Sequence, residues 1–123
     1  GRRDLIITEA RLSLTQSDAN AVWALSREYG ERRSASQPSG RTAGSIFCKS
    51  GGCSAGALIE GAGLKGRRMG GARISDIHAN FLVNEGGATC ADAEGLITLC
   101  EAEVKKRYGI SLKREIITLG GGF

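Results

Sequence analysis

The sequence is poor in aromatic residues and in proline, and it contains a single histidine. Three Phe, two Tyr and one Trp are too few for the stacking platform on which many proteins bind single-stranded nucleic acid. No apolar run approaches about 18 residues, the length that a membrane-spanning helix needs. The opening segment, GRRDLIITEA, also lacks the apolar core of a secretory signal. We therefore expect a cytoplasmic protein that has neither a nucleic acid nor a membrane as its partner.

The four cysteines do not follow a metal-binding pattern. The spacings C-x4-C (Cys48 and Cys53) and C-x9-C (Cys90 and Cys100) together fit no structural zinc pattern, and His78 is a poor supplementary ligand. We therefore predict no metal site. In a reducing cytoplasm the thiols are expected to be free or buried, although the spacing of Cys48 and Cys53 also allows a disulfide.

The composition is that of an ordinary globular domain, with 41% hydrophobic and 24% charged residues. A length of 123 residues predicts one domain, and the net charge of +4 is mild. Only the segment 65–73 concentrates cations, because Lys65, Arg67, Arg68 and Arg73 have no carboxylate among them. This cationic segment is typical either of an anion-binding site or of a solvated loop. No recognised nucleic-acid-binding motif accompanies it.

Alternating apolar and polar residues predict a strand at each end of the chain, over 4–14 and 111–119. A further strand is expected at Phe81, Leu82 and Val83. Between the first strand and the middle of the chain we expect a helix and then a polar loop over 31–44.

Three helices are predicted from the spacing of apolar residues and from capping residues. The first follows Asp18 and places Val22, Leu25 and Tyr29 on one face. The second is short and has Ser54 as its cap, and the third begins after Thr89, carries an apolar stripe that includes Cys100, and ends before Gly109. Strands and helices without a regular βαβ alternation favour an α+β fold.

Four segments in order resemble one family: AGSIF (43–47), SAGALIEGAGLKG (54–66), GGARISDIHANFLVN (70–84) and SLKREIITLG (111–120). Together they are similar to the C-terminal, substrate-binding domain of UDP-N-acetylenolpyruvoylglucosamine reductase, also called UDP-N-acetylmuramate dehydrogenase. The resemblance implies a small antiparallel sheet packed with a few helices. It also implies that residues 1–15 are the end of the last strand of a flavin domain and a connector, and that 16–123 form the substrate-binding domain.

The resemblance implies a flavin-dependent reduction. The family reduces the enolpyruvyl ether of UDP-N-acetylglucosamine to UDP-N-acetylmuramate for peptidoglycan, and it uses NADPH through a bound FAD. The flavin domain would join this chain in cis or in trans, and the chain alone would be inactive. No glycine-rich loop for FAD is apparent, since Gly70-Gly71 leads into an extended segment.

The family's site residues fall on particular positions of this sequence. The proton donor of the family's serine motif corresponds to Ser45, with Ile46 and Phe47 as its anchor in the core, and the glutamate of the last strand corresponds to Glu115. Substrate-binding positions correspond to Arg41, Lys49 and His78, although His78 is equally typical of a structural histidine.

One turn departs from the family's pattern. The family usually continues its serine motif with Lys or Arg, then Asn, then Pro, whereas this chain has Cys48, Lys49 and Ser50. Lys49 offers a point charge to a phosphate but not the paired donor and acceptor of an amide. The departure leaves an alternative function, a nucleotide-sugar-binding module without redox activity.

Overall fold

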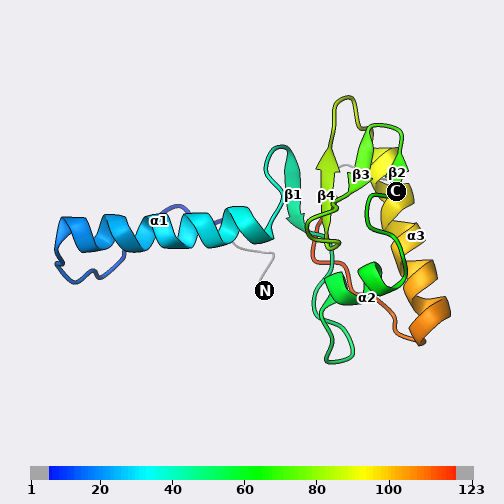
Figure 1. Cartoon of the computed structure of the whole chain (residues 1–123), viewed down its shortest axis with the longest axis horizontal. Helices are drawn as coiled ribbons and strands as arrows, with labels where there is room; N and C mark the ends of the chain where they lie inside the picture. Colours follow the sequence, from blue (N-terminus) through cyan, green and yellow to red (C-terminus); the bar gives the residue numbers. More distant parts are fainter. Residues whose placement is uncertain (1–5, 119–123) are drawn as a thin grey trace. The chain divides into compact units, whose positions relative to one another are not determined.

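The computed structural model describes residues 6–118. The chain divides into two compact units, 1–31 and 32–123. The first contains most of helix α1, Ala19–Ser36, and the second contains the sheet and the other helices (Figure 1).

The first unit contains no buried core among its described residues. Residues 6–18 have no regular secondary structure and are exposed, and α1 buries no residue. The prediction of a strand over 4–14 is therefore wrong for 6–14, while residues 4 and 5 lie outside the described residues. A strand needs a neighbouring strand for its backbone hydrogen bonds, and no described residue of this chain pairs with 6–14.

Helix α1 begins and ends through ordinary local chemistry. The Asp18 carboxylate accepts a hydrogen bond from the Ala21 N–H (2.8 Å), which confirms the predicted capping function of this segment. The helix continues through 31–36 and a strand begins at Thr42, so the predicted loop over 31–44 is confirmed only for 37–41. Glu31, Arg32 and Arg33 are good helix formers, and the helix stops shortly before Pro38.

The sheet of the second unit has four antiparallel strands in the order β1-β4-β3-β2. Their bounds are Thr42–Ser45 (β1), Arg68–Met69 (β2), Ala72–Ile74 (β3) and Phe81–Asn84 (β4). The strand predicted at 81–83 is confirmed as β4, in which Phe81 and Leu82 are buried and Val83 is only half-buried. The architecture is α+β, which confirms the predicted fold class.

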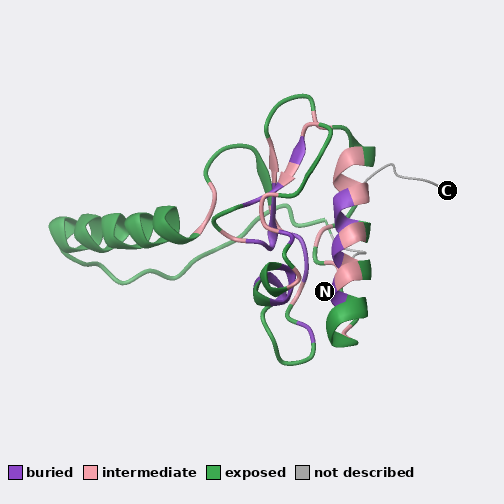
Figure 2. Cartoon of the chain, turned by 45° about the vertical axis from the view of Figure 1, so that its right-hand side comes forward, coloured by how far each residue is buried: buried purple, intermediate pink, exposed green. Residues whose placement is uncertain are grey.

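Two helices complete the core of this unit. Helix α2 spans Ala55–Gly61 and helix α3 spans Cys90–Tyr108, and α3 contacts β2, β3 and α2 (Figure 1). Buried residues lie in the sheet, in α2 and along one face of α3 (Figure 2). On α3 the buried stripe consists of Leu96, Ile97, Cys100 and Val104, as predicted.

Helix α3 is capped at both ends by the residues that the sequence predicted. The Thr89 hydroxyl accepts from the Asp92 N–H (3.1 Å), and the Asp92 carboxylate accepts from the Thr89 N–H (2.9 Å), which together form a capping box. Gly109 ends the helix with φ of +71° and donates its N–H to the Lys105 carbonyl (2.9 Å). At α2, by contrast, Ser54 occupies the cap position but its side chain makes no capping hydrogen bond, so that detail of the prediction is wrong.

The closing strand is reduced to a single bridge. Arg114 pairs with Phe47 in an isolated antiparallel bridge, and the remainder of 110–118 has no regular secondary structure. The prediction of a strand over 111–119 is therefore wrong within 111–118, and Leu119 lies outside the described residues. The opposite segment turns away through the hairpin at Ser50 and Cys53, so the ladder cannot extend.

Replacing the cap residue of α3 tests the capping box. We expect Thr89→Ala to lower the free energy of unfolding of the 123-residue chain by about 1 kcal/mol, because an N-terminal N–H loses its acceptor. Denaturant titration followed by circular dichroism measures the change. Thr98→Ala, on an exposed position of the same helix, is the control and should be nearly neutral; equal effects of both changes would contradict the capping contribution.

The Asp92 carboxylate gives this cap a pH dependence. Hydrogen bonds from Thr89 lower the pKa of Asp92. A lowered folded-state pKa means that the ionised form stabilises the fold above the unfolded-state pKa of about 4, and that this contribution disappears as the pH falls through the folded-state value. Thermal melts of the wild type and of Asp92→Asn should therefore differ at neutral pH and converge in acid. A difference that stays constant down to the lowest pH would contradict this assignment.

Candidate functional site

Ser45 is the last residue of β1 and follows a bulge. The register places Thr42 opposite Val83 and Ser45 opposite Phe81, so β1 has one extra residue between these pairs. Gly44 has φ of +81°, a conformation that favours glycine, and its N–H donates to the Thr42 hydroxyl (3.1 Å). Ser45 is half-buried, and its hydroxyl has no hydrogen-bond partner within residues 6–118. The bulge therefore orients a serine whose hydroxyl is available to a ligand.

The two residues after Ser45 are fixed in the core. Ile46 and Phe47 are each 1% exposed, which agrees with their predicted anchoring function. The Phe47 N–H donates to the Asn80 side-chain oxygen (3.0 Å), and the Asn80 amide donates to the Phe47 carbonyl (2.8 Å). The Asn80 carbonyl also accepts from the Ile46 N–H (2.9 Å). Sequence reasoning missed Asn80; its one signal was a polar residue inside the apolar segment 79–83.

Glu115 lies on the segment beside this anchor. Its N–H donates to the Ile46 carbonyl (2.8 Å), and the Cys48 N–H donates to the Lys113 carbonyl (2.8 Å). The structure thus brings the backbones that carry Ser45 and Glu115 onto adjacent segments. The Glu115 side chain is exposed, so none of the described residues encloses its carboxyl group.

The residue before Glu115 makes an ion-pair network with helix α3. Arg114 donates from Nε and Nη2 to the two carboxylate oxygens of Glu101 (2.7 and 2.8 Å) and from Nη1 to Glu94. These hydrogen bonds, first to Glu101 and then to Glu94, raise the pKa of Arg114. Both glutamates lie on α3, so the network joins the C-terminal segment to this helix.

His78 lies in a small cavity of its own. Its Nδ1 accepts from the Asn80 N–H (3.2 Å), and its ring packs edge-on against Phe81 with centroids 5.0 Å apart. A Cβ at Gly56 would lie 2.9 Å from the ring, so the glycine makes room for it. The cavity, about 200 Å³, is also lined by Ser54 and Glu60, but Ser45 and Glu115 are not among its lining residues.

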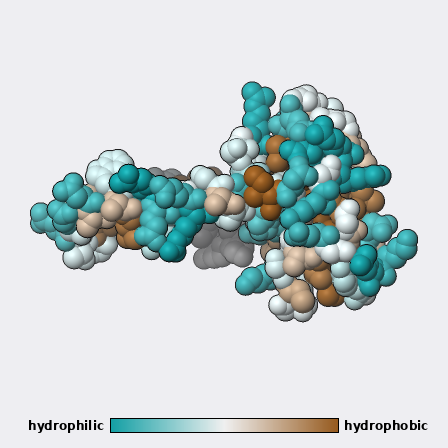
Figure 3. Space-filling model, in the orientation of Figure 1, coloured by the Kyte–Doolittle hydropathy of each residue, from teal (hydrophilic) through white to brown (hydrophobic). Residues whose placement is uncertain are grey.

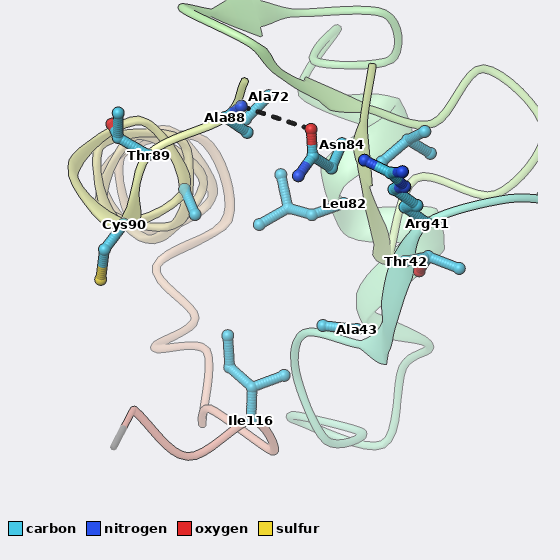
Figure 4. Close-up of a pocket in the computed structure, with 12 residues that line it drawn as sticks. Arg41, Thr42, Ala43, Ala72, Leu82, Asn84, Ala88, Thr89, Cys90 and Ile116 are labelled. Atoms are coloured by element: carbon cyan, nitrogen blue, oxygen red, sulfur yellow. Dashed lines mark hydrogen bonds between the residues drawn. The ribbon is translucent and has the colours of Figure 1, made fainter. Parts of the chain in front are cut away.

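A larger cavity of about 490 Å³ lies between the sheet and the start of α3 (Figure 4). Most of its lining is apolar, from Ala43, Ala72, Leu82, Ala88 and Ile116 among others. The Asn84 side-chain oxygen accepts from the Gly86 N–H (2.9 Å) and the Ala88 N–H (3.3 Å) beside it. Arg41, a predicted substrate-binding residue, is exposed and lines this cavity, whereas Lys49 is exposed and lines neither cavity. Ala43 lies two residues before Ser45, and Ile116 directly follows Glu115, so the cavity borders the segments that carry both residues.

The cationic segment 65–73 is largely paired. Lys65 bonds Glu60 (2.7 Å), Arg68 bonds Glu85 (2.9 Å), and Arg73 bonds both Glu85 (2.7 Å) and Asp76. These pairs favour the solvated-loop interpretation over an anion site. The Gly70-Gly71 pair forms the turn between β2 and β3.

Among residues 6–118 neither a disulfide nor a metal site is formed. Cys48, Cys53, Cys90 and Cys100 are all free, so no Cys48–Cys53 disulfide is present, and burial raises the pKa of Cys100 to about 12. In this part of the chain no group of three or more His, Cys, Asp or Glu side chains is arranged to hold a metal ion. Nor is any helix there both long and apolar enough to cross a membrane.

Comparison with known sequences decides the family. The sequence model of the family "UDP-N-acetylenolpyruvoylglucosamine reductase, C-terminal domain" matches residues 36–119. The chain belongs to this family. The reductases of Anaeromyxobacter dehalogenans strain 2CP-C and Geobacter metallireducens are 47% and 44% identical to it over 116 residues, which cover 94% of this chain and 35% and 39% of those proteins.

Solved structures agree. The crystal structure of the UDP-N-acetylenolpyruvylglucosamine reductase from Thermus caldophilus superposes with a TM-score of 0.70 at 34% identity, over 88% of this chain and 39% of that one. The chain therefore spans a little over a third of the length of its reductase relatives. Because 116 of 123 residues align with the Anaeromyxobacter reductase, the alignment includes most of the segment before residue 36, which lies outside the domain model.

Replacing Asn80 tests whether its two hydrogen bonds to Phe47 stabilise the segment that follows Ser45. We expect Asn80→Ala to lower the free energy of unfolding by roughly 2–4 kcal/mol, because the buried N–H and carbonyl of Phe47 both lose their partner. Denaturant unfolding of the 123-residue chain measures this. Asn84→Ala, which removes an amide from a half-buried turn, should cost clearly less, and an equal cost at both positions would contradict the special importance of the Asn80–Phe47 pair.

Proposed function

We propose that this chain is the substrate-binding and proton-donating domain of a UDP-N-acetylenolpyruvoylglucosamine reductase. The full-length enzyme would reduce UDP-N-acetylglucosamine enolpyruvate to UDP-N-acetylmuramate for peptidoglycan, with NADPH as reductant and FAD as carrier. The observation that carries this proposal is the half-buried Ser45, presented after a bulge with its hydroxyl free among the described residues and with Glu115 on the adjacent segment. Membership of the reductase family supports it.

Ser45 and Glu115 would act on two neighbouring groups of the substrate, the carbon that is protonated and the carboxylate. A reduced flavin, when bound, supplies hydride to the terminal vinyl carbon. The adjacent carbon, next to the carboxylate, then takes the proton of the Ser45 hydroxyl: the O–H bond breaks, a C–H bond forms, and the serine oxygen recovers a proton from solvent. A serine is a weak acid, so it serves only against a strongly basic carbon and from a fixed position. Glu115 would act at the substrate carboxylate, where negative charge builds in the transition state.

Three further residues are proposed to bind the substrate. Arg41 and Lys49 are exposed cations on either side of the Ser45 motif and suit an anionic diphosphate. His78 Nδ1 accepts from the Asn80 N–H, and its Nε2 has no hydrogen-bond partner among residues 6–118, so this second ring nitrogen remains for a ligand.

The described residues do not fit FAD. The pair Gly70-Gly71, the nearest approach to a phosphate loop, closes a hairpin and does not open a helix. We therefore assign FAD and NADPH to a flavin domain that joins this chain in cis or in trans, and we expect this chain alone to be inactive.

The first unit offers a surface for that flavin domain. The large apolar side chains of its described residues are exposed, among them Ile6, Leu14, Trp23 and Tyr29, and the surface of α1 in Figure 3 carries apolar patches. We propose that residues 1–15 complete the flavin domain and that 16–123 form the substrate-binding domain. The free thiols suit a reducing compartment, and we place the reaction in the cytoplasm.

A reconstituted enzyme tests the reaction and the function of Ser45. This chain is joined to the preceding part of the Anaeromyxobacter reductase, and stopped-flow absorbance follows flavin reduction by NADPH and flavin reoxidation by UDP-N-acetylglucosamine enolpyruvate. We expect Ser45→Ala to slow reoxidation roughly 10²–10⁴-fold, since the proton donor is lost, and to leave reduction by NADPH unchanged. Ser111→Ala, at an exposed serine, is the control.

Two outcomes would overturn parts of this proposal. If Ser45→Ala reoxidises as fast as the wild type, Ser45 is not the proton donor. If the wild-type fusion binds the substrate but never reoxidises its flavin, the altered turn Cys48-Lys49-Ser50 marks a nucleotide-sugar-binding module without redox activity.

A further inference from the structure

Arg114 makes an ion-pair network that the site described so far does not use. Its guanidinium binds Glu101 through a two-pronged pair of hydrogen bonds (2.7 and 2.8 Å) and Glu94 through the remaining nitrogen. The side chains of Arg114, Glu94 and Glu101 are 34%, 44% and 30% exposed. Glu94 and Glu101 are seven residues apart and therefore lie on one face of α3. The planar guanidinium suits such a two-sided arrangement, whereas an ammonium does not.

The position of Arg114 in the chain gives this network its importance. Arg114 forms the only bridge between its segment and Phe47 among the described residues, and the next residue, Glu115, donates its N–H to the Ile46 carbonyl. Residues 110–118 have no helix or continuous strand to fix them. Where Glu115 lies relative to Ser45 thus depends on a few backbone hydrogen bonds and on the Arg114 side chain, which ties the segment to the longest helix.

We propose that Arg114 is a positioning residue for the reduction: its fork onto Glu101 and Glu94 fixes the segment that carries Glu115 against the segment that carries Ser45. This inference rests on the proposed function. Partly exposed ion pairs contribute little to stability, whereas a small displacement of a reacting group lowers a rate strongly. The network should therefore matter far more to the rate of the oxidative half-reaction than to folding.

The first experiment compares Arg114→Gln and Arg114→Lys in the reconstituted enzyme. At saturating UDP-N-acetylglucosamine enolpyruvate we expect Arg114→Gln to slow flavin reoxidation roughly 10- to 100-fold. The amplitude of the flavin signal and the rate of reduction by NADPH should stay unchanged. Arg114→Lys keeps the charge but not the fork, and should recover only part of the rate. Arg107→Gln removes a cation from an exposed position and should behave as the wild type.

A double-mutant cycle separates positioning from a general structural effect. If Arg114 acts through Glu115, Arg114→Gln should add no further loss of rate in a Glu115→Gln background. Glu101→Gln removes the other side of the fork and should slow reoxidation in the same direction, so it carries the test if Arg114→Gln does not fold.

Distinct results would overturn the inference and the proposed function. An unchanged rate in Arg114→Gln, a multiplied loss in the Glu115→Gln background, or an equal slowing of reduction by NADPH would each overturn the positioning function of Arg114. A wild-type fusion whose flavin is reduced by NADPH but never reoxidised by the substrate would instead overturn the proposed reduction itself.

Discussion

The site depends on the pairing of one buried side-chain amide with one backbone amide, that of Asn80 with Phe47. A carboxamide presents a donor and an acceptor with nearly the spacing of a peptide group, so it can replace one step of a β ladder. The replacement is needed here because β1 ends at Ser45 and β4 begins at Phe81, so Phe47 has no strand residue to pair with on that side. Without it, two polar groups of Phe47 would be buried without partners in the core, which is costly.

The same segment is also held from its other side. The Ile46 and Cys48 backbones bond to Glu115 and Lys113, and the Arg114 side chain carries that second segment onto α3. Ser45 is thus carried by a strand end that is fixed on both sides by polar contacts and from within by two buried apolar residues, Ile46 and Phe47. The proposed proton transfer from Ser45 would benefit from such fixation, since a proton donor contributes only when it is held within hydrogen-bond reach of its acceptor.

Sequence reasoning succeeded where the signal was local. The start and end of α3 follow from Thr89 and Gly109, its stripe follows from helical spacing, and β4 follows from a short apolar run. It failed where the decisive partner is distant in the sequence. Residues 6–14 and 111–118 alternate as strands do, yet alternation cannot say whether a partner strand is present. The bond of Asn80 to Phe47 spans 33 residues, and that of Arg114 to Glu94 spans 20, so no short pattern indicates either. The family resemblance named Ser45 and Glu115, but it carried no information about the contacts that hold them.

The bulge at Gly44 is not required for the sheet to form, but it sets the orientation of Ser45. A sheet pairs equally well, and with less strain, when both strands have the same number of residues between their anchor points. The loss of one residue from β1 would make the ladder regular. Because side chains alternate along a strand, Ser45 would then point to the opposite face of the sheet relative to the residues before it. Insertions and deletions of a single residue are therefore the changes that this short strand tolerates least, even though its first two residues are exposed. We therefore expect the length of this strand to be constrained as strictly as the glycine at position 44, whose φ of +81° few other residues adopt.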